Sequence, residues 1–480
     1  MNDRASARLN LHSQLAAFVR RKPVTAMPET PLQEVVEMMA ENNVGSVVIL
    51  EPESSRPIGI FTLRDLLREV ATKGFDPHAM VASMIADTNL PMLHWRQSAY
   101  QAEMLMARQG AHHVIVVDAS GRLKGVVSQG DILDLQRGGI KAISGAIRNA
   151  RDMETLLAAA ADVRRFARQM VTEGHGAEQL TETISSLNDH LAVRVLELTR
   201  FEHQLPKVEW CWVAFGSEGR YEQTLSTDQD NGIIFEAKKE DAEAIRLAFL
   251  PFAQEVNRRL DACGFTLCKG NIMAGNPELC LSLQEWKHRF SDWMRCSNPD
   301  ALLNATIYFD FRAIYGADEV ADELRRWLLT TIPNESTFQR LMADNAVRAK
   351  PPVGVIRDFV FDDNKEFPHT LDLKGFGSRP FVDAARILAL ASDVAETSTT
   401  ERLRALQRNG KLGREDVSAM IDGFHFIQEL RLRHQRNGAG EGAENRIDPD
   451  NLNELDRNVL KIAFKQAKKL QDKLTLDYKL

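Results

Sequence analysis

The sequence lacks several features that mark membrane, secreted or nucleic-acid-binding proteins. None of its apolar runs reaches the roughly 18 residues that a membrane-spanning helix needs. The first residues, MNDRASARLN, contain no apolar signal core. Lysine and arginine are dispersed along a chain of net charge −7, with no long basic run. We therefore expect no membrane span and no nucleic-acid partner.

Cysteine is also scarce, at five among 480 residues. The number is odd, and the positions do not have the spacing of a metal site. Because disulfides are rare in the cytosol, we predict reduced thiols in a cytoplasmic protein. The hydrophobic content of 44% and charged content of 26% are typical of globular proteins. At this length we expect about three domains.

The segment 212–235, WVAFGSEGRYEQTLSTDQDNGIIF, is the most informative part of the chain. Residues 212–215 and 232–235 are short apolar runs, as buried strands are. Residues 218–225 are polar and contain good helix formers, so they predict a short helix. Small and polar turn residues separate these parts. The segment therefore predicts strand, tight turn, helix, turn and strand.

Two small sets of residues in this segment are candidates for binding a ligand. Gly216, Ser217 and Gly219 predict a turn at a helix N-terminus, where free backbone N–H groups favour a phosphate. Asp228 and Asp230 are two residues apart at a strand edge, so both carboxylates point to the same side. Each feature alone is more often an ordinary turn. Together, between two strands, they predict a Mg²⁺ site for a nucleoside triphosphate.

This segment resembles the polymerase-β-like nucleotidyltransferase fold, whose motif is Gly-Ser followed by Asp-x-Asp. The longer string, Gly-Ser-x-Gly-Arg-x-Glu-Gln and then Thr-Asp-Gln-Asp-Asn-Gly, is similar to bacterial proteins that fuse paired CBS domains to a nucleotidyltransferase domain related to protein-PII uridylyltransferase. The resemblance implies that Gly216, Ser217 and Gly219 hold the β- and γ-phosphates of the nucleotide. Arg220 either neutralises phosphate charge or pairs with a neighbouring glutamate on a helix surface.

A third carboxylate is implied by the same resemblance. Residues 301–312, ALLNATIYFDFR, predict a strand that ends in Asp310. In the related enzymes, such an aspartate helps to hold the metal that activates the acceptor. The implied set is two Mg²⁺ ions bridged by Asp228 and Asp230, with Asp310 completing the second metal site and taking the acceptor's proton. The alternative is an ordinary strand-end aspartate paired with Arg312.

The N-terminal part contains an internal repeat. The pattern Gly-x-x-Thr/Ser-x-x-Asp follows an apolar strand at residues 59–65 and again at 125–131. This repeat resembles a tandem CBS pair, in which the hydroxyl contacts phosphate and the carboxylate contacts ribose of an adenine nucleotide. The residues that match are Thr62, Asp65, Ser128 and Asp131. The alternative is that the hydroxyls only cap helices, with the pair serving as a dimerisation platform.

The predicted architecture is multidomain, α/β and α. The expected parts are a tandem CBS pair at 15–138, a helical connector at 139–206, a polymerase-β-like nucleotidyltransferase domain with a mixed sheet and helices at 207–330, and a helical substrate-binding domain at 335–480. The connector is either a packed helical hairpin or an element that reports CBS occupancy. In the last domain, Lys374, Arg379 and Arg386 suit a phosphate or an acidic acceptor, or are solvated charges.

The function that these resemblances imply is Mg²⁺-dependent transfer of a nucleoside monophosphate from ATP or UTP to an acceptor, with a signalling protein favoured. AMP, ADP or ATP at the CBS pair would regulate it, and a homodimer is expected. None of the twelve histidines precedes an aspartate, so the His-Asp motif with which the uridylyltransferase removes nucleotide is not present. The alternatives are a catalytically silent nucleotide sensor and transfer to a small molecule such as an antibiotic.

Overall fold

The computed structural model describes residues 13–19, 22–42, 44–81, 90–295, 306–354, 359–438, 440 and 442–480. The chain forms two compact units, Met1–Ala142 and Ile143–Leu480. Each unit is described by itself below. Within the described residues, no helix combines the length and the apolar character needed to cross a bilayer.

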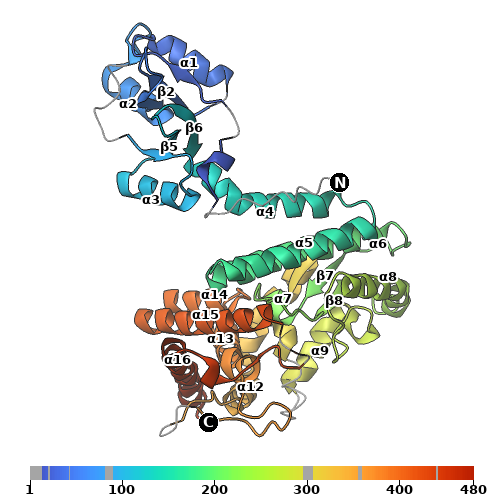
Figure 1. Cartoon of the computed structure of the whole chain (residues 1–480). Coiled ribbons are helices and arrows are strands. Elements are labelled where there is room, and N and C mark those ends of the chain that lie inside the picture. Colours follow the sequence, from blue (N-terminus) through green and yellow to red (C-terminus); the bar gives the residue numbers. More distant parts are fainter. Residues whose placement is uncertain are drawn as a thin grey trace, which may run out of the picture. The chain divides into compact units, whose positions relative to one another are not determined.

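The N-terminal unit contains the same small α/β arrangement twice (Figure 1). Each copy is a three-stranded sheet in which the middle strand pairs parallel with the first strand and antiparallel with the third. The first copy contains β1 (Thr25–Ala26), α1 (Leu32–Glu41), β2 (Ser46–Leu50), β3 (Pro57–Thr62) and α2 (Leu63–Lys73). The second contains β4 (Met92–His94), α3 (Ala99–Gln109), β5 (His113–Val117), β6 (Leu123–Ser128) and α4 (Gln129–Asn149). The tandem CBS-like repeat predicted from the sequence is confirmed.

The second unit is built around a four-stranded mixed sheet of order β10-β7-β8-β9. Strands β7 (Trp210–Ala214) and β8 (Asn231–Phe235) are antiparallel and buried along their whole length. The edge strands are β9 (Cys280–Ser282), parallel to β8, and β10 (Arg312–Gly316), antiparallel to β7. Three helices contact this sheet: α8 (Ala242–Ala262), α9 (Leu283–Arg295) and α11 (Asp318–Thr331).

Two elements near the predicted site differ from expectation. The helix after β7 is only α7 (Gly216–Gly219), and residues 220–230 form an irregular loop. The strand predicted at 301–312 is wrong where it is described, because Thr306–Phe309 is a 3-10 helix and β10 begins after Asp310. The apolar residues there serve core packing: Phe309 and Phe311 are both 1% exposed. Residues 301–305 lie outside the described part of the chain.

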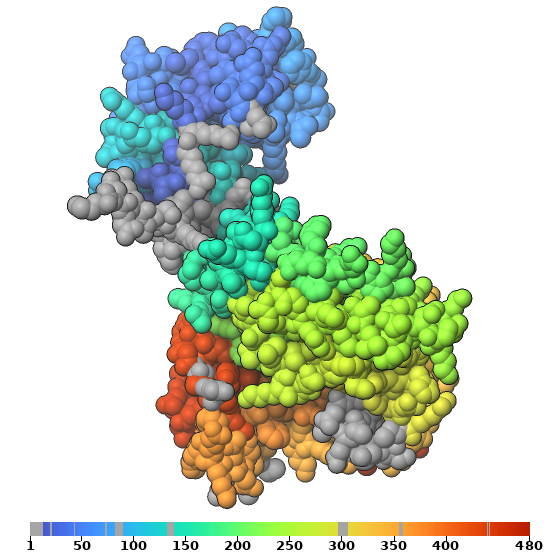
Figure 2. All heavy atoms as spheres, turned by 90° about the vertical axis from the view of Figure 1, so that its right-hand side faces the viewer, coloured from blue at the N-terminus to red at the C-terminus, as the bar shows by residue number. Residues whose placement is uncertain are grey.

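Helices that precede the sheet in the sequence and helices that follow it both pack in this unit. The connector helices α5 (Met153–Thr172) and α6 (Ala177–Arg200) lie side by side, and α6 contacts α8 and β10. The C-terminal helices are α12 (Ser336–Arg348), α13 (Arg379–Leu390), α14 (Thr399–Arg408), α15 (Arg414–Arg436) and α16 (Glu454–Tyr478). They share one hydrophobic core with the sheet. In Figure 2 the region near residue 250 (yellow-green) and the C-terminal helices (orange to red) adjoin within this unit.

Candidate functional site

The two aspartates after the loop face one cavity. Gln229, between them, is buried and donates to the carbonyl oxygens of Asn257 and Phe265, at 2.9 Å each. Because side chains alternate along an extended chain, Asp228 and Asp230 on either side of it point the other way. Both line a cavity of about 540 Å³. Their common orientation therefore follows from the burial of Gln229.

The turn after β7 brings Gly216 against this pair. Gly216 has a φ of +56°, and a Cβ built there would lie 3.1 Å from a carboxylate oxygen of Asp230. Only glycine adopts this conformation at such close range without strain. Gly216 and Ser217 both line the cavity, at the first residues of α7. Their backbone N–H groups belong to the first turn, where helical donors lack intrahelical partners.

Gly219 has a different role from the one that the resemblance implied. It does not line the cavity with Gly216 and Ser217. A Cβ at this position would lie 1.9 Å from the carbonyl oxygen of Asp310. Gly219 therefore allows the short helix to pack against the backbone before β10. The structure gives it a packing function in place of the predicted phosphate contact.

The cavity joins acidic and basic side chains from distant parts of the chain. The segment 212–235 contributes Asp228, Asp230, Glu222 and Arg220. The C-terminal helices and the segment before them contribute Lys374, Arg379, Asp383, Arg386 and Arg431, and a later loop contributes Arg446. The three basic residues singled out from the sequence, Lys374, Arg379 and Arg386, thus lie in the same cavity as the aspartate pair.

Like charges meet at the aspartate end of the cavity. Burial raises the pKa of the Asp230 carboxyl to about 6. The charge of Asp228 adds to the rise, while the Lys374 ammonium and a hydrogen bond with the Cys268 thiol oppose it. Two carboxylates that disfavour each other's ionisation are stabilised by a cation between them. Hard carboxylate oxygens suit Mg²⁺, which proteins commonly bind through one or two carboxylates plus substrate phosphates.

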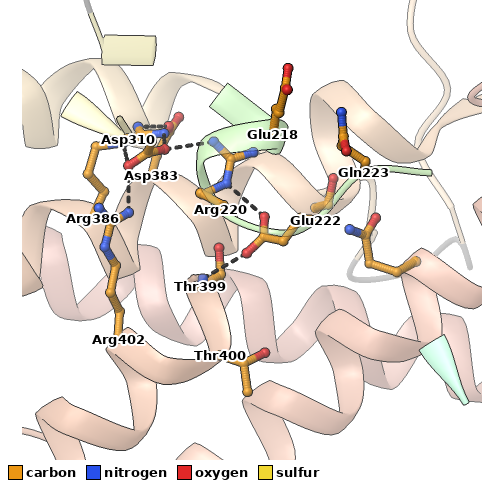
Figure 3. A network of polar contacts seen from close by, with 12 residues as sticks. Glu218, Arg220, Glu222, Gln223, Asp310, Asp383, Arg386, Thr399, Thr400 and Arg402 are labelled. Atoms are coloured by element: carbon orange, nitrogen blue, oxygen red, sulfur yellow. Dashed lines mark hydrogen bonds and ion pairs between the residues drawn. The ribbon is translucent and has the colours of Figure 1, made fainter. Parts of the chain in front are cut away.

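Asp310 lies at the centre of a buried arginine cluster. The side chain is 0% exposed, and each carboxylate oxygen accepts two hydrogen bonds. Figure 3 shows Arg220, Arg386 and Arg402 converging on it. Burial alone would raise the pKa of Asp310, but the charges of the three guanidinium groups outweigh burial and hold that pKa well below its usual range.

This environment does not fit the implied metal role of Asp310. Its oxygens are occupied by guanidinium groups, and Asp310 is not part of the cavity lining. Within the described ranges, no group of three histidine, cysteine, aspartate or glutamate side chains is arranged to hold a metal ion. Asp310 also does not form the alternative pair with Arg312, which instead bonds Asp189 at 2.6 Å. Of the three predicted metal carboxylates, Asp228 and Asp230 therefore face the cavity, and Asp310 does not.

The loop between α7 and the aspartates is tied to three other elements. Arg220 bonds Glu222 at 2.7 Å, and Glu222 accepts from the backbone N of Thr399 at the start of α14. Gln223, 1% exposed, accepts from Asn188 of α6 at 3.1 Å. The side chain of Gln435 on α15 accepts from the backbone N of Leu225 and Ser226. Glu222 and Gln223 of the family string are therefore anchors of the loop.

Several of these residues were beyond reach of sequence reasoning. Arg402 and Arg431 look like ordinary solvated helix positions, because each stands in a helical stretch that contains several other charged residues. In the structure they are 1% and 7% exposed. Only the long-range packing of α14 and α15 in the second unit reveals them. The family string pointed to Glu222 and Gln223 but indicated no role for them.

In the N-terminal unit, the four predicted nucleotide contacts form two matching capping boxes. The Thr62 hydroxyl donates to Asp65 at 2.6 Å, and the Ser128 hydroxyl donates to Asp131 at 2.6 Å. Each hydroxyl also accepts from the backbone N of its aspartate. Both aspartates lie close enough to His113 to act on its pKa, which burial lowers. The structure thus realises the cap in both repeats.

The mixed sheet, the aspartate pair and the helical C-terminal part together define a nucleotidyltransferase-type protein with CBS-like repeats. Family models agree with this class. Residues 161–300 match "Putative nucleotidyltransferase DUF294", residues 336–478 match "Putative nucleotidyltransferase substrate binding domain", and residues 15–72 and 96–138 match "CBS domain". The chain is therefore a fusion of CBS domains with a nucleotidyltransferase of the DUF294 family and its substrate-binding domain.

Individual relatives match about a quarter of the chain. An uncharacterized protein of Methanopyrus kandleri is 33% identical over 117 residues, which span 24% of this chain and 59% of that protein. A CBS domain protein from Pyrobaculum aerophilum complexed with AMP is 25% identical and covers 26% of this chain and 98% of its own, with a TM-score of 0.23. A CBS-domain-containing protein from Agrobacterium tumefaciens shows the same identity and coverage, with a TM-score of 0.24.

The packing role of Gly219 predicts that a methyl group there destabilises the fold. Gly219→Ala places a Cβ on the Asp310 carbonyl, and we expect a loss of about 1–3 kcal/mol of unfolding free energy. Gly145→Ala is the control, because a Cβ there meets nothing within 4 Å and alanine favours helix. Thermal unfolding followed by circular dichroism checks both. Equal midpoints for wild type and Gly219→Ala would contradict the packing role.

Glu218 predicts a pH-dependent loss of stability. Burial raises its pKa to about 8, the charge of Asp189 adds to the rise, and Arg312 opposes it. The folded state therefore keeps a proton that the unfolded state loses above the ordinary glutamate pKa of 4.5, so this group lowers stability as pH rises from 4.5 to 8. Figure 3 shows Glu218 pointing away from the arginine cluster.

We expect Glu218→Gln to remove this penalty. The variant should melt close to wild type at pH 5 and above it at pH 8.5, with a difference on the order of a few kcal/mol. Melting curves of both proteins across this pH range measure the effect. A midpoint difference that stays constant with pH would show that Glu218 does not titrate in this way.

Proposed function

We propose that the protein is a Mg²⁺-dependent nucleotidyltransferase that moves a nucleoside monophosphate from ATP or UTP to an acceptor. The observation that carries the proposal is one cavity in which Asp228 and Asp230 face Gly216 and a lining of basic side chains. Carboxylates for a divalent cation and guanidinium or ammonium groups for phosphates are the two things that a bound metal–triphosphate needs. A volume of about 540 Å³ lies within the usual range for small-ligand sites.

Each residue has a part in this reaction. Asp228 and Asp230 hold the metal, which when bound neutralises charge on the phosphates and orients them. The backbone N–H groups of Gly216 and Ser217 receive phosphate oxygens, and Lys374 balances the remaining charge. An acceptor hydroxyl oxygen attacks the α-phosphorus and gives up its proton to water, while the bond from the α-phosphorus to the α,β-bridging oxygen breaks and pyrophosphate leaves. The protein thus contributes mainly positioning and charge stabilisation.

Arg220 and Asp310 act on this reaction through position. Arg220 lines the cavity, but its guanidinium is held at 2.7 Å by Glu222 and at 2.6 Å by Asp310. It therefore presents a positive charge whose place does not depend on the ligand. Asp310 lies outside the cavity lining and holds the guanidinium groups of Arg220 and Arg386 through ion pairs. We therefore propose it as a positioning residue in place of a metal ligand.

The CBS domains supply the proposed regulation. Thr62, Asp65, Ser128 and Asp131 occupy matching places in the two repeats and form the same cap in each. We propose that they receive phosphate and ribose groups of AMP, ADP or ATP. A homodimer is part of the proposal, since α2 exposes Leu63, Leu67 and Val70 at helical spacing. A signalling protein remains the favoured acceptor, from the uridylyltransferase-like string alone.

The transferase activity is tested by removing the metal carboxylates. Asp228→Asn with Asp230→Asn keeps the shape of the side chains and relieves their repulsion, so the fold should melt no lower than wild type. We expect Mg²⁺-dependent pyrophosphate release and label transfer from ATP or UTP, measured with a host lysate as acceptor source, to fall on the order of 100-fold or more. Asp241→Asn with Asp261→Asn, two exposed positions outside the cavity, is the control. Equal background release by wild type and both variants would favour the silent-sensor alternative.

The regulatory site is tested by ligand-induced stabilisation. AMP at about 100 times its Kd should add roughly 2.7 kcal/mol to the stability of the unit that binds it. Asp65→Ala with Asp131→Ala should remove the melting shift, and it should also lower the starting midpoint because both residues belong to caps.

Ser98→Ala separates the two effects. Ser98 forms a capping box on α3 of the same unit but is not one of the proposed nucleotide contacts. This variant should lose stability and keep the AMP-induced shift. An unchanged shift in the double aspartate variant would remove the CBS assignment and leave the transferase proposal standing.

A further inference from the structure

Most basic side chains of the cavity already have acidic partners. Arg220 pairs with Glu222 and Asp310, and Arg386 pairs with Asp310 and Asp383. Arg379 also pairs with Asp383, and Arg446 pairs with Asp362. Within the described part of the chain, no carboxylate forms an ion pair with either of the two remaining cations. They are Lys374 and Arg431.

Arg431 is the unusual member of this pair because it is buried. It is 7% exposed, and its hydrogen bonds go to neutral amides, to Asn445 at 2.8 Å and to Gln428. Burial lowers its pKa to about 10, so it keeps its charge at neutral pH. A buried charge without an ion-pair partner is costly. The two bonds use two of the five guanidinium donors, which leaves others for a ligand in the cavity.

The two unpaired cations come from different elements around the cavity. Lys374 lies close enough to Asp230 to lower its pKa. Arg431 stands on α15 and bonds Asn445 at 2.8 Å, whereas Asp228 and Asp230 belong to the loop after α7. Arg431 is therefore a second unpaired cation in the cavity lining, contributed by a different element from Lys374.

We propose that Arg431, together with the amides of Gln428 and Asn445, binds an oxyanion of the acceptor, either a carboxylate or a phosphate. This inference rests on the proposed transferase function, in which the nucleotide occupies the end of the cavity at Asp228, Asp230 and Lys374. The planar guanidinium suits both kinds of oxyanion, because two of its N–H groups match two oxygens. The amide side chains hold the guanidinium through their oxygens and carry further donors of their own. The acceptor is thus an anionic molecule or segment.

Calorimetric titrations separate the two ends of the cavity. The first measures the Kd of Mg²⁺ with α,β-methylene-ATP or the matching UTP analogue, which cannot be cleaved at the α-phosphorus. The second titrates inorganic phosphate, and separately succinate, into the nucleotide-saturated protein. Binding of phosphate or of succinate also tells which oxyanion the acceptor carries. We expect wild type to bind the nucleotide analogue and at least one of the two anions.

Three variants give the result its meaning. Arg431→Gln should weaken the anion by about tenfold or more and leave the nucleotide Kd within about twofold. Lys374→Gln should weaken the nucleotide analogue by about tenfold or more and leave the anion Kd within about twofold. Arg433→Gln removes the same charge from the same helix, outside the cavity at a residue paired with Glu429 and Asp456, and should change neither Kd. As a further check, Arg431→Lys keeps the charge without the planar fork and should recover part of the anion binding.

Two outcomes would overturn the inference. The first is nucleotide binding that falls in Arg431→Gln as it does in Lys374→Gln, which would make Arg431 part of the triphosphate site. The second is saturated wild-type protein that binds neither phosphate nor succinate. If wild type does not bind the nucleotide analogue at all, the proposed function fails. The anion titrations into free wild type and Arg431→Gln then decide the role of Arg431 separately, with an equal Kd for both proteins overturning it.

Discussion

The second unit depends on the hydrogen bonds and ion pairs that buried arginines make with the carboxylate of Asp310. This carboxylate accepts hydrogen bonds from arginines of three elements: Arg220 of the loop after α7, Arg386 of α13 and Arg402 of α14. Three guanidinium groups cannot be buried together without anions between them, since their mutual repulsion is strong at low dielectric. Removing one partner from such a buried cluster typically costs about 3–5 kcal/mol. Asp310 therefore joins the sheet to the C-terminal helices and holds Arg220 and Arg386, which line the cavity.

The same network explains why the cavity has a defined charge pattern. Glu222, Asp310 and Asp383 neutralise Arg220 and Arg386, whose positions are then set by the protein alone. Groups that are already oriented need no reorganisation when a ligand arrives, which is how preorganised sites stabilise charge. Lys374 and Arg431 have no such partners among the described residues, so a bound anion gains most from these two side chains.

The part of the site that could be predicted from sequence is the part made by neighbours in sequence. Gly216, Asp228 and Asp230 lie within one strand–turn–strand segment, and the alternation around Gln229 follows from local geometry. The resemblance pointed to Asp310 but implied a metal site around it. Its contacts in the structure instead come from arginines that stand 76 and 92 positions further along the chain. Nothing local distinguishes Arg402 or Arg431 from a solvated helical arginine. Their burial depends on how α14 and α15 pack, which the sequence pattern does not encode residue by residue.

The loop that contains Asp228 and Asp230 is held by three helices, which therefore set the position of this pair. Gln223 is bound by α6, Glu222 by the start of α14, and the backbone at Leu225 by α15. Each contact is buried or partly buried, where a hydrogen bond left unmade costs its full desolvation penalty. A shift of any one helix must therefore break a bond or carry the loop with it. Because Asp228 and Asp230 end this loop, their position relative to Gly216 depends on the contacts that the three helices make with it.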